Sequence, residues 1–193
     1  LWQLATTERV ALWLCRALVS GCLLVPPVFL HHVATVVGTA SAPWPRRLIR
    51  WGYVTAAILL IADTTPLVVR TVAPRLSFPY WPLPGPLWVF YTFWFFAYTS
   101  YTIGLMYRTY RTAVGPFRNQ LRYLLMGTII AFGGASTNFF LWYDIPIPPV
   151  GNVVVPFYVI LAALAAIRYQ LMDIKIGITQ TGFTMSLVGG NDS

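Results

Sequence analysis

The side chains able to do acid–base chemistry are few and scattered along this chain. The five acidic residues are Glu8, Asp63, Asp144, Asp173 and Asp192, and no two of them have the spacing that pairs carboxylates on one helix face. The sequence also lacks a phosphate-binding glycine loop and a Cys/His cluster with metal-ligand spacing. We therefore expect no enzymatic activity and no bound cofactor.

One basic and one acidic residue lie at matching depths in two apolar segments. Arg16 is seven positions after Arg9, and Asp63 is seven positions before Arg70, so on helices both would lie about 10 Å below one membrane surface. A charge inside a bilayer needs a partner or water. The match predicts that Arg16 and Asp63 face each other or share a polar cavity. Alternatively, Arg16 extends to the surface and Asp63 bonds backbone freed by Pro66.

Other polar residues could complete an outward-facing pocket around this pair. They lie at the outer end of the fourth apolar segment, and an aromatic loop would cover them. The polar residues are Asn138, Tyr143 and Asp144, and the loop carries Phe78, Tyr80 and Trp81. The alternative is an aromatic belt at the membrane interface with no ligand.

His31 and His32 are the other candidates for chemistry, because a histidine in a membrane segment can bind a metal. They lie about 33 Å along a helix from Arg9, near the opposite interface. Adjacent helical residues point about 100° apart, so both cannot face one ligand. We expect an interfacial or packing role for both, with a metal-binding role as the alternative.

The amino-acid composition indicates that the segments carrying these residues lie in a membrane. Of 193 residues, 58% are hydrophobic and only 9% are charged, whereas a water-soluble domain has about 25% charged residues. Thirteen basic residues against five acidic ones give a formal charge of +8. In a membrane protein such an excess lies in cytoplasmic loops, so we expect no nucleic-acid partner.

Five apolar segments are long enough to cross a bilayer, which takes about 20 residues. The sequence therefore predicts an all-α membrane helix bundle over residues 1–176, followed by a short cytoplasmic tail over residues 177–193. The predicted spans are residues 10–37, 51–69, 87–107, 123–142 and 150–169.

The basic residues predict the orientation of the bundle. Nine lie in connections on one side, and three, Arg9, Arg70 and Arg75, lie on the other. Because basic loops stay in the cytoplasm, we expect the N-terminus outside and the C-terminus inside. The nine are Arg46, Arg47, Arg50, Arg108, Arg111, Arg118, Arg122, Arg168 and Lys175.

The fourth predicted span carries a stripe of small residues. Gly127, Ala131 and Ala135 recur every four positions. Small residues let membrane helices approach closely, so this stripe predicts a helix-packing surface. Packing within the chain and packing against another subunit are both compatible with the spacing.

Five motifs follow one another along the chain: VPPVFLH (residues 25–31), GPL (85–87), RNQLRYLLMG (118–127), IPPVGN (147–152) and AIRYQLMDI (166–174). The most specific one leaves the fifth span and contains Arg168, Tyr169 and Asp173. In this order the motifs resemble the seven-helix membrane domain at the N-terminus of some bacterial sensor histidine kinases.

The resemblance implies a sensory or signal-transducing bundle in the bacterial inner membrane, with five of seven helices present. It also implies that the final helix leads through Arg168, Tyr169 and Asp173 to a cytoplasmic output domain. The chain departs from the family because both histidines precede the second span, so no phosphoacceptor histidine follows the bundle. The chain is then either a fragment of a longer sensor or a bundle without its output.

Two functions remain open from the sequence. The first is a non-enzymatic membrane sensor whose partner is an output domain. The second is an accessory subunit that packs against a larger respiratory or photosynthetic membrane complex. A transporter is disfavoured, because no inverted repeat is visible and only one acidic residue, Asp63, lies within a span.

Overall fold

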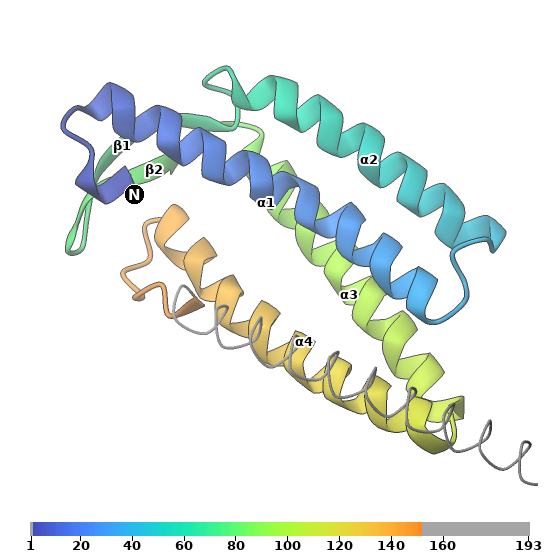
Figure 1. Cartoon of the computed structure of the whole chain (residues 1–193). Helices are drawn as coiled ribbons and strands as arrows, with labels where there is room; N and C mark the ends of the chain where they lie inside the picture. The colour runs from blue at the N-terminus through green and yellow to red at the C-terminus, as the bar shows by residue number, and fades with distance from the viewer. Residues whose placement is uncertain (1, 152–193) are drawn as a thin grey trace, which may run out of the picture.

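The computed structural model describes residues 2–151, which form four helices and one β-hairpin (Figure 1). This part of the chain is mostly helical, as predicted, but the all-α prediction is wrong for the hairpin. A short 3-10 helix, η1 (Trp2–Leu4), precedes the bundle. The elements that follow are α1 (Glu8–Val36), α2 (Pro43–Asp63), β1 (Val69–Arg75), β2 (Phe78–Pro84), α3 (Trp88–Thr112) and α4 (Gly115–Trp142).

Helix α1 starts at a side-chain cap and continues through two prolines. The hydroxyl of Thr7 accepts the N–H of Val10 at 3.4 Å, and Glu8 in the first turn suits the positive end of the helix dipole. Pro26 and Pro27 are both buried inside the helix. Each proline removes one main-chain hydrogen bond without ending the helix, so the middle of α1 is held mainly by packing.

The second predicted span, residues 51–69, is displaced in the structure. Helix α2 begins earlier and ends at Asp63. The hydroxyls of Thr64 and Thr65 donate to main-chain carbonyls of its last turn at 2.7 and 2.6 Å, and the chain then turns at Pro66. The apolar residues after the turn therefore enter a strand rather than a span.

The hairpin pairs β1 with β2 antiparallel, with Val72 opposite Pro82. Each strand has one unpaired edge, which is where prolines are tolerated in a sheet. Beyond β2, the N–H of Gly85 donates to the carbonyl of Val68 at 2.8 Å. A Cβ at Gly85 would overlap the carbonyl oxygen of Leu67, so only glycine fits at this junction.

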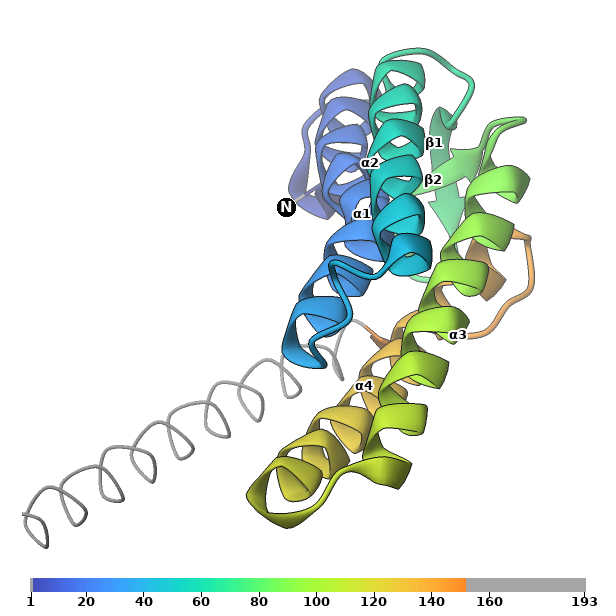
Figure 2. The ribbon, with the colours of Figure 1, turned by 90° about the vertical axis from the view of Figure 1, so that its right-hand side faces the viewer.

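Helices α1 and α3 are the central pair, because α1 packs against α2 and α3, and α3 also packs against α4 (Figures 1 and 2). Near mid-length the helices come very close at Gly52 of α2. A Cβ there would lie 2.9 Å from side-chain atoms of both Pro27 and Tyr98. The three-helix junction is therefore closely packed around one residue without a side chain.

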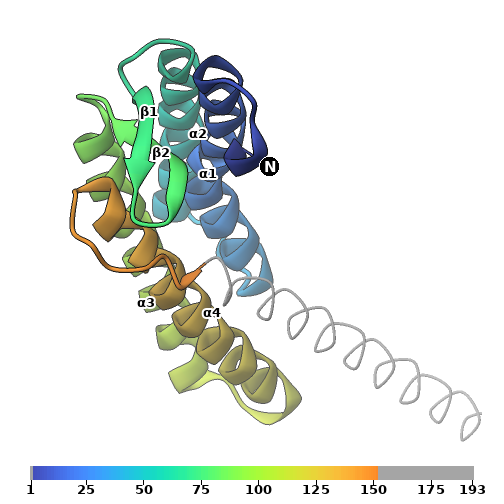
Figure 3. The same cartoon turned by 90° about the vertical axis from the view of Figure 1, so that its left-hand side faces the viewer.

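The hairpin covers one end of the bundle, where α1 begins and where α2 and α4 end (Figures 1 and 3). We call this the hairpin end. The turns from α1 to α2 and from α3 to α4 lie at the opposite end. We call it the arginine end, after its exposed residues Arg46, Arg47, Arg50, Arg108, Arg111, Arg118 and Arg122. The core at the hairpin end is aromatic, with Trp88 stacked on Trp142 at a centroid distance of 3.5 Å. At the arginine end it is mainly aliphatic, with Val33, Met106 and Leu121 buried together.

Two of the described helices, α1 and α4, are long and apolar enough to cross a membrane. Helix α2 loses its predicted apolar end to the hairpin, and α3 is rich in tryptophan, tyrosine and threonine, which are less hydrophobic than aliphatic residues. The described residues therefore do not support five spans or fix an orientation. From residue 152 onward, the predicted fifth span and the predicted tail lie outside the description.

Candidate functional site

Arg16 is buried at the hairpin end, with 8% of its surface exposed. Its guanidinium donates to the main-chain carbonyl of Thr64 and to that of Val69, both at 3.1 Å. Thr64 follows the last residue of α2, so the cation lies at the negative end of that helix dipole. Arg16 therefore holds the turn between α2 and β1 in place and does not extend to the surface.

Asp63 lies in the same buried cluster, with 2% of its surface exposed. Its Oδ2 accepts a hydrogen bond from the hydroxyl of Ser20 at 3.2 Å. Ser20 is four residues after Arg16, so both side chains leave the same face of α1. Arg16 acts electrostatically on the Asp63 carboxylate. Within residues 2–151, however, no salt bridge joins the two side chains directly.

Two polar atoms of this cluster remain unsatisfied. Arg16 Nε and Asp63 Oδ1 are buried, and neither has a hydrogen-bond partner among the described residues. A buried polar atom without a partner costs about 1–3 kcal/mol, and more when the group is charged, so this cluster is held at an energetic cost.

The hairpin is tied to three other elements around this cluster. The side chain of Gln3 in η1 bonds both the carbonyl and the N–H of Tyr80, as a neighbouring strand would. Val72 of β1 packs on Ala11 and Cys15 of α1. The tie to α4 is an ion pair between Arg75 and Asp144, just beyond the helix.

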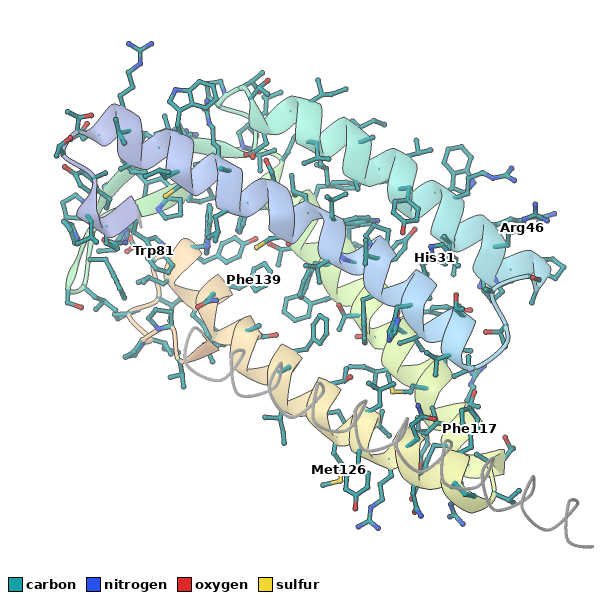
Figure 4. All side chains as sticks on the ribbon, in the orientation of Figure 1. His31, Arg46, Trp81, Phe117, Met126 and Phe139 are labelled. Atoms are coloured by element: carbon teal, nitrogen blue, oxygen red, sulfur yellow. The ribbon has the colours of Figure 1, made fainter. Side chains whose placement is uncertain are left out.

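The predicted aromatic loop is strand β2, and it is part of the core instead of an open cover. Trp81 is buried, and its ring lies 5.2 Å from that of Phe78. Figure 4 shows Trp81 at the hairpin end, beyond Phe139 of α4. Asn138 is partly buried on α4, and the Tyr143 hydroxyl lies 2.8 Å from that of Thr92. These residues surround a packed aromatic core.

The small-residue stripe of α4 is partly covered by the chain itself. Ala131 is buried, while Gly127 and Ala135 are partly buried. The segment after α4 returns along the helix, and the N–H of Gly151 donates to the hydroxyl of Thr137 at 3.1 Å. A Cβ at Gly151 would overlap the main chain of α4 at Gly134 and Ala135. Small residues on both segments therefore permit this close approach.

The histidines lie away from the cluster, on the exposed side of α1. His31 Nδ1 is 3.2 Å from the hydroxyl of Tyr53 on α2, and the two rings meet edge to face. His32 is exposed. Among residues 2–151, no group of three or more His, Cys, Asp or Glu side chains could hold a metal ion.

Sequence reasoning missed Ser20, Gln3 and the pairing of Arg75 with Asp144. Ser20 could have been found, because it stands four positions after Arg16 on the same helix face. Gln3 and the Arg75–Asp144 pair could not, because both depend on a hairpin that was not predicted. The predicted exit motif, with Arg168, Tyr169 and Asp173, lies outside the described residues.

The arrangement joins a buried charged cluster to a hairpin that contacts most of the bundle. Comparisons of the chain with known protein families, with curated proteins and with solved structures find no match.

Proposed function

We propose that this chain is a non-enzymatic, multi-pass membrane module that senses a stimulus at its hairpin end and transmits it through the bundle. In this proposal it lies in the bacterial inner membrane, with the hairpin end outside and the arginine end in the cytoplasm. The proposal follows the resemblance to the membrane domains of sensor histidine kinases, whose output would leave through Arg168, Tyr169 and Asp173.

The exposed surfaces of the helices support the membrane placement. Large apolar side chains are exposed on all four, for example Leu18 on α1, Ile58 on α2, Phe93 on α3 and Ile130 on α4. In the 18-residue stretch of highest mean hydropathy, only 33% of α1 and 22% of α4 is buried within the protein. A core helix in a water-soluble protein is mostly buried, so these faces favour contact with lipid.

The single observation that carries the sensing proposal is the buried cluster of Arg16 and Asp63 next to the hairpin. Ionisable groups are expensive inside a membrane protein and commonly mark functional sites. Here they link α1 to the end of α2 and to β1. Anything that moves the hairpin or changes this cluster therefore changes how α1 sits against its neighbours.

Transmission along the bundle would use two alternative packings of its helices. Pro26 and Pro27 weaken the hydrogen bonding in the middle of α1, at the level where Gly52 of α2 is in close contact. Pro66 lies in the turn that Arg16 holds. A stimulus would shift the balance between the two packings, and so move the arginine ends of α1 and α4 relative to each other.

The alternative, an accessory subunit of a larger membrane complex, is favoured by the exposed aromatic face of α3. Phe93 has 76% of its surface exposed, and Phe90 and Phe96 are exposed nearby. Such side chains suit contacts with another helix as well as with lipid. A subunit of this kind would be recovered in fixed stoichiometry with its complex and would not need two packings.

Spin-label distances test the sensing proposal. Cysteines replace Ser41, in the turn after α1, and Asn119, in the second turn of α4, in a chain whose native cysteines are alanine. Both positions are exposed at the arginine end. Arg16→Ala should change the distance distribution between the two labels in bilayers, although the substitution is at the other end.

The control is Arg70→Ala, which removes an exposed arginine from the hairpin end without touching the cluster. It should leave the distances as they are in the parent chain. An Arg16→Ala protein that stays folded and gives the parent distribution would contradict transmission and would favour the accessory role.

A further inference from the structure

Seven exposed arginines gather at the end of the bundle opposite the hairpin. The start of α2, the end of α3 and the start of α4 all contribute, because successive helices run in opposite directions (Figure 1). Figure 4 shows Arg46 at this end, beside the turn from α1 to α2. No acidic residue of the described chain lies there. The seven are Arg46, Arg47, Arg50, Arg108, Arg111, Arg118 and Arg122.

The hairpin end has a different balance of basic and acidic residues. Its arginines, apart from the buried Arg16, are Arg9, Arg70 and Arg75, and among the described residues it also holds Glu8, Asp63 and Asp144. Arg75 is already paired with Asp144. The excess positive charge of residues 2–151 therefore lies almost entirely at the arginine end.

The exposed face of α2 changes character in a fixed order along the helix. Trp44, Arg47 and Trp51 come first, at three- and four-residue spacing on one face, and all three are exposed. Ile58 and Ile61 follow on the same side, also exposed. From Arg47 to Ile61 the helix rises about 21 Å, so the face passes from basic and aromatic to fully apolar.

Helices α3 and α4 repeat this order from their own ends. On α4, Arg118 and Arg122 precede Tyr123, which is 67% exposed, and the apolar residues Ile129 and Ile130 follow. On α3, read backward from its end, Arg111 and Arg108 come before Tyr107 and then Phe96 and Phe93, all exposed. All three helices thus place exposed guanidinium groups and aromatic rings nearest the arginine end, with exposed apolar side chains following along the helix.

Two of the guanidinium groups are positioned by tyrosine rings at the turn between α3 and α4. Arg111 lies 6.0 Å from the ring centroid of Tyr107 and donates to its hydroxyl at 3.2 Å. Arg118 lies 5.3 Å from the ring centroid of Tyr110. A guanidinium held against a ring still presents several N–H donors outward, in a geometry that fits phosphate oxygens.

We propose that the arginine end is a recognition surface for the phosphate headgroups of anionic phospholipids. The inference rests on the proposed membrane placement. Guanidinium groups and aromatic rings nearest the helix ends, followed by apolar side chains, match headgroup and interface followed by hydrocarbon in one leaflet. The arginines also come from three helices whose exposed side chains beyond them are large and apolar, which fits lipid better than an acidic protein or a nucleic acid.

Spin-labelled lipids measure this selectivity directly. The full chain is purified and incorporated into phosphatidylcholine vesicles that carry a trace of spin-labelled phosphatidylglycerol or phosphatidylcholine. The fraction of label immobilised by the protein gives the relative association constant of the two lipids. We expect a preference for phosphatidylglycerol of about twofold to fivefold, falling toward one in high salt, because the attraction between exposed charges is screened.

Three groups of substitutions locate the preference, and each leaves at least four of the seven arginines to preserve insertion. All the altered side chains are exposed, so folding should persist, and thermal unfolding in detergent checks it. Each group should lower the preference, while the control group at the hairpin end should not. The groups are Arg46→Gln with Arg47→Gln and Arg50→Gln, Arg108→Gln with Arg111→Gln, and Arg118→Gln with Arg122→Gln, and the control is Arg9→Gln with Arg70→Gln.

The possible results separate this inference from the function it rests on. If the chain enters phosphatidylcholine vesicles but shows equal affinity for both lipids, or a preference that salt and all three groups leave unchanged, the lipid inference is overturned and the membrane placement stands. If the chain does not enter vesicles of either composition, both are overturned.

Discussion

The charged side chains at the two ends of the bundle differ in their burial and in their bonding partners. At the hairpin end, Arg16 and Asp63 are buried and bonded to the chain's own backbone and to Ser20. At the arginine end, Arg111 and Arg118 are exposed and lie against tyrosine rings, with no acidic partner among the described residues. The buried charged groups of the first end are bonded within the chain, apart from Arg16 Nε and Asp63 Oδ1, whereas the second end leaves its guanidinium groups exposed to an external partner.

The connections between helices differ in the same way. The turns at the arginine end are short, and a glycine, Gly38 or Gly115, adopts the positive φ that each requires. The link between α2 and α3 is instead a strand pair docked on η1, α1 and α4. The hairpin end is therefore bonded to more elements than the arginine-end turns are, so substitutions there should affect stability far more than matched substitutions at the arginine end.

The largest expected effect is at Arg16. Arg16→Ala removes the cation from the C-terminal end of α2 and leaves Asp63 buried without it, so we expect a loss of about 3–5 kcal/mol of stability. The matched change at the other end, Arg47→Ala, should cost less than about 0.5 kcal/mol, because Arg47 is exposed. Chemical unfolding in detergent measures both.

A double-mutant cycle sharpens this result. If Arg16 and Asp63 form one cluster, Asp63→Ala should cost less in the Arg16→Ala chain than in the parent chain, by about 1 kcal/mol or more. Additive losses would mean that each side chain acts through its own backbone or Ser20 contact only.

Gly85→Ala comes next in size. A Cβ at Gly85 would overlap the carbonyl oxygen of Leu67, and backbone cannot move aside cheaply. We expect a loss of about 3 kcal/mol and separation of the hairpin from the start of α3. Gly104→Ala is the control, since its Cβ would meet nothing within 4 Å. Thermal unfolding of the two variants should differ clearly, and equal midpoints would contradict the docked hairpin.

Gly52→Ala tests the junction between the two ends. Its Cβ would lie 2.9 Å from Pro27 and Tyr98, so the helices must separate slightly, at a cost of about 1–2 kcal/mol. Gly21→Ala on α1 should be neutral or slightly stabilising, because nothing lies within 4 Å and alanine favours a helix. The same unfolding measurement compares them, and a neutral Gly52→Ala would show that α1 and α2 are not closely packed there.

The smallest expected effect is at the tip of the hairpin. Leu76 has a φ of 51°, a left-handed conformation that costs a leucine about 1 kcal/mol. Leu76→Gly should therefore stabilise the chain slightly or leave it unchanged, whereas Gly38→Ala, at a φ of 73° in the arginine-end turn, should destabilise it. Shifts of the unfolding midpoint in the same direction for both variants would contradict these turn conformations.

The sequence predicted helices where uninterrupted apolar runs dominate. The predicted spans at residues 10–37 and 123–142 fall on α1 and α4, because their apolar runs meet no competing turn. The hairpin was missed because two short strands are marginal alone and form here by docking on helices. Its first strand also continues an apolar run, so residues 51–69 read as a single span.

From the sequence, the candidate site could be predicted only as far as it depends on how deep each side chain lies in its apolar segment. Arg16 and Asp63 were matched because each lies a fixed distance from the end of its apolar segment, and the structure places both in one cluster. The actual partners of Arg16 are the carbonyls of Thr64 and Val69. Main-chain partners carry no side-chain signature, so no reading of residue types could have identified them.

Cysteine accessibility in intact membrane vesicles tests most directly whether the bundle crosses a bilayer with its two ends on opposite sides. Cys22 is exposed on the side of α1, about 20 Å along the helix from Arg9, so hydrocarbon should shield it. Ser41→Cys and Ser77→Cys, made with both native cysteines replaced by alanine, place thiols in the arginine-end turn and at the hairpin tip.

We expect a membrane-impermeant maleimide to leave Cys22 unlabelled until detergent is added. The reagent should label the cysteine introduced at Ser77 only from outside and the one introduced at Ser41 only from the cytoplasmic side. Labelling of Cys22 in intact vesicles, or labelling of both introduced cysteines from one side, would contradict a bundle that crosses the bilayer with its ends on opposite sides.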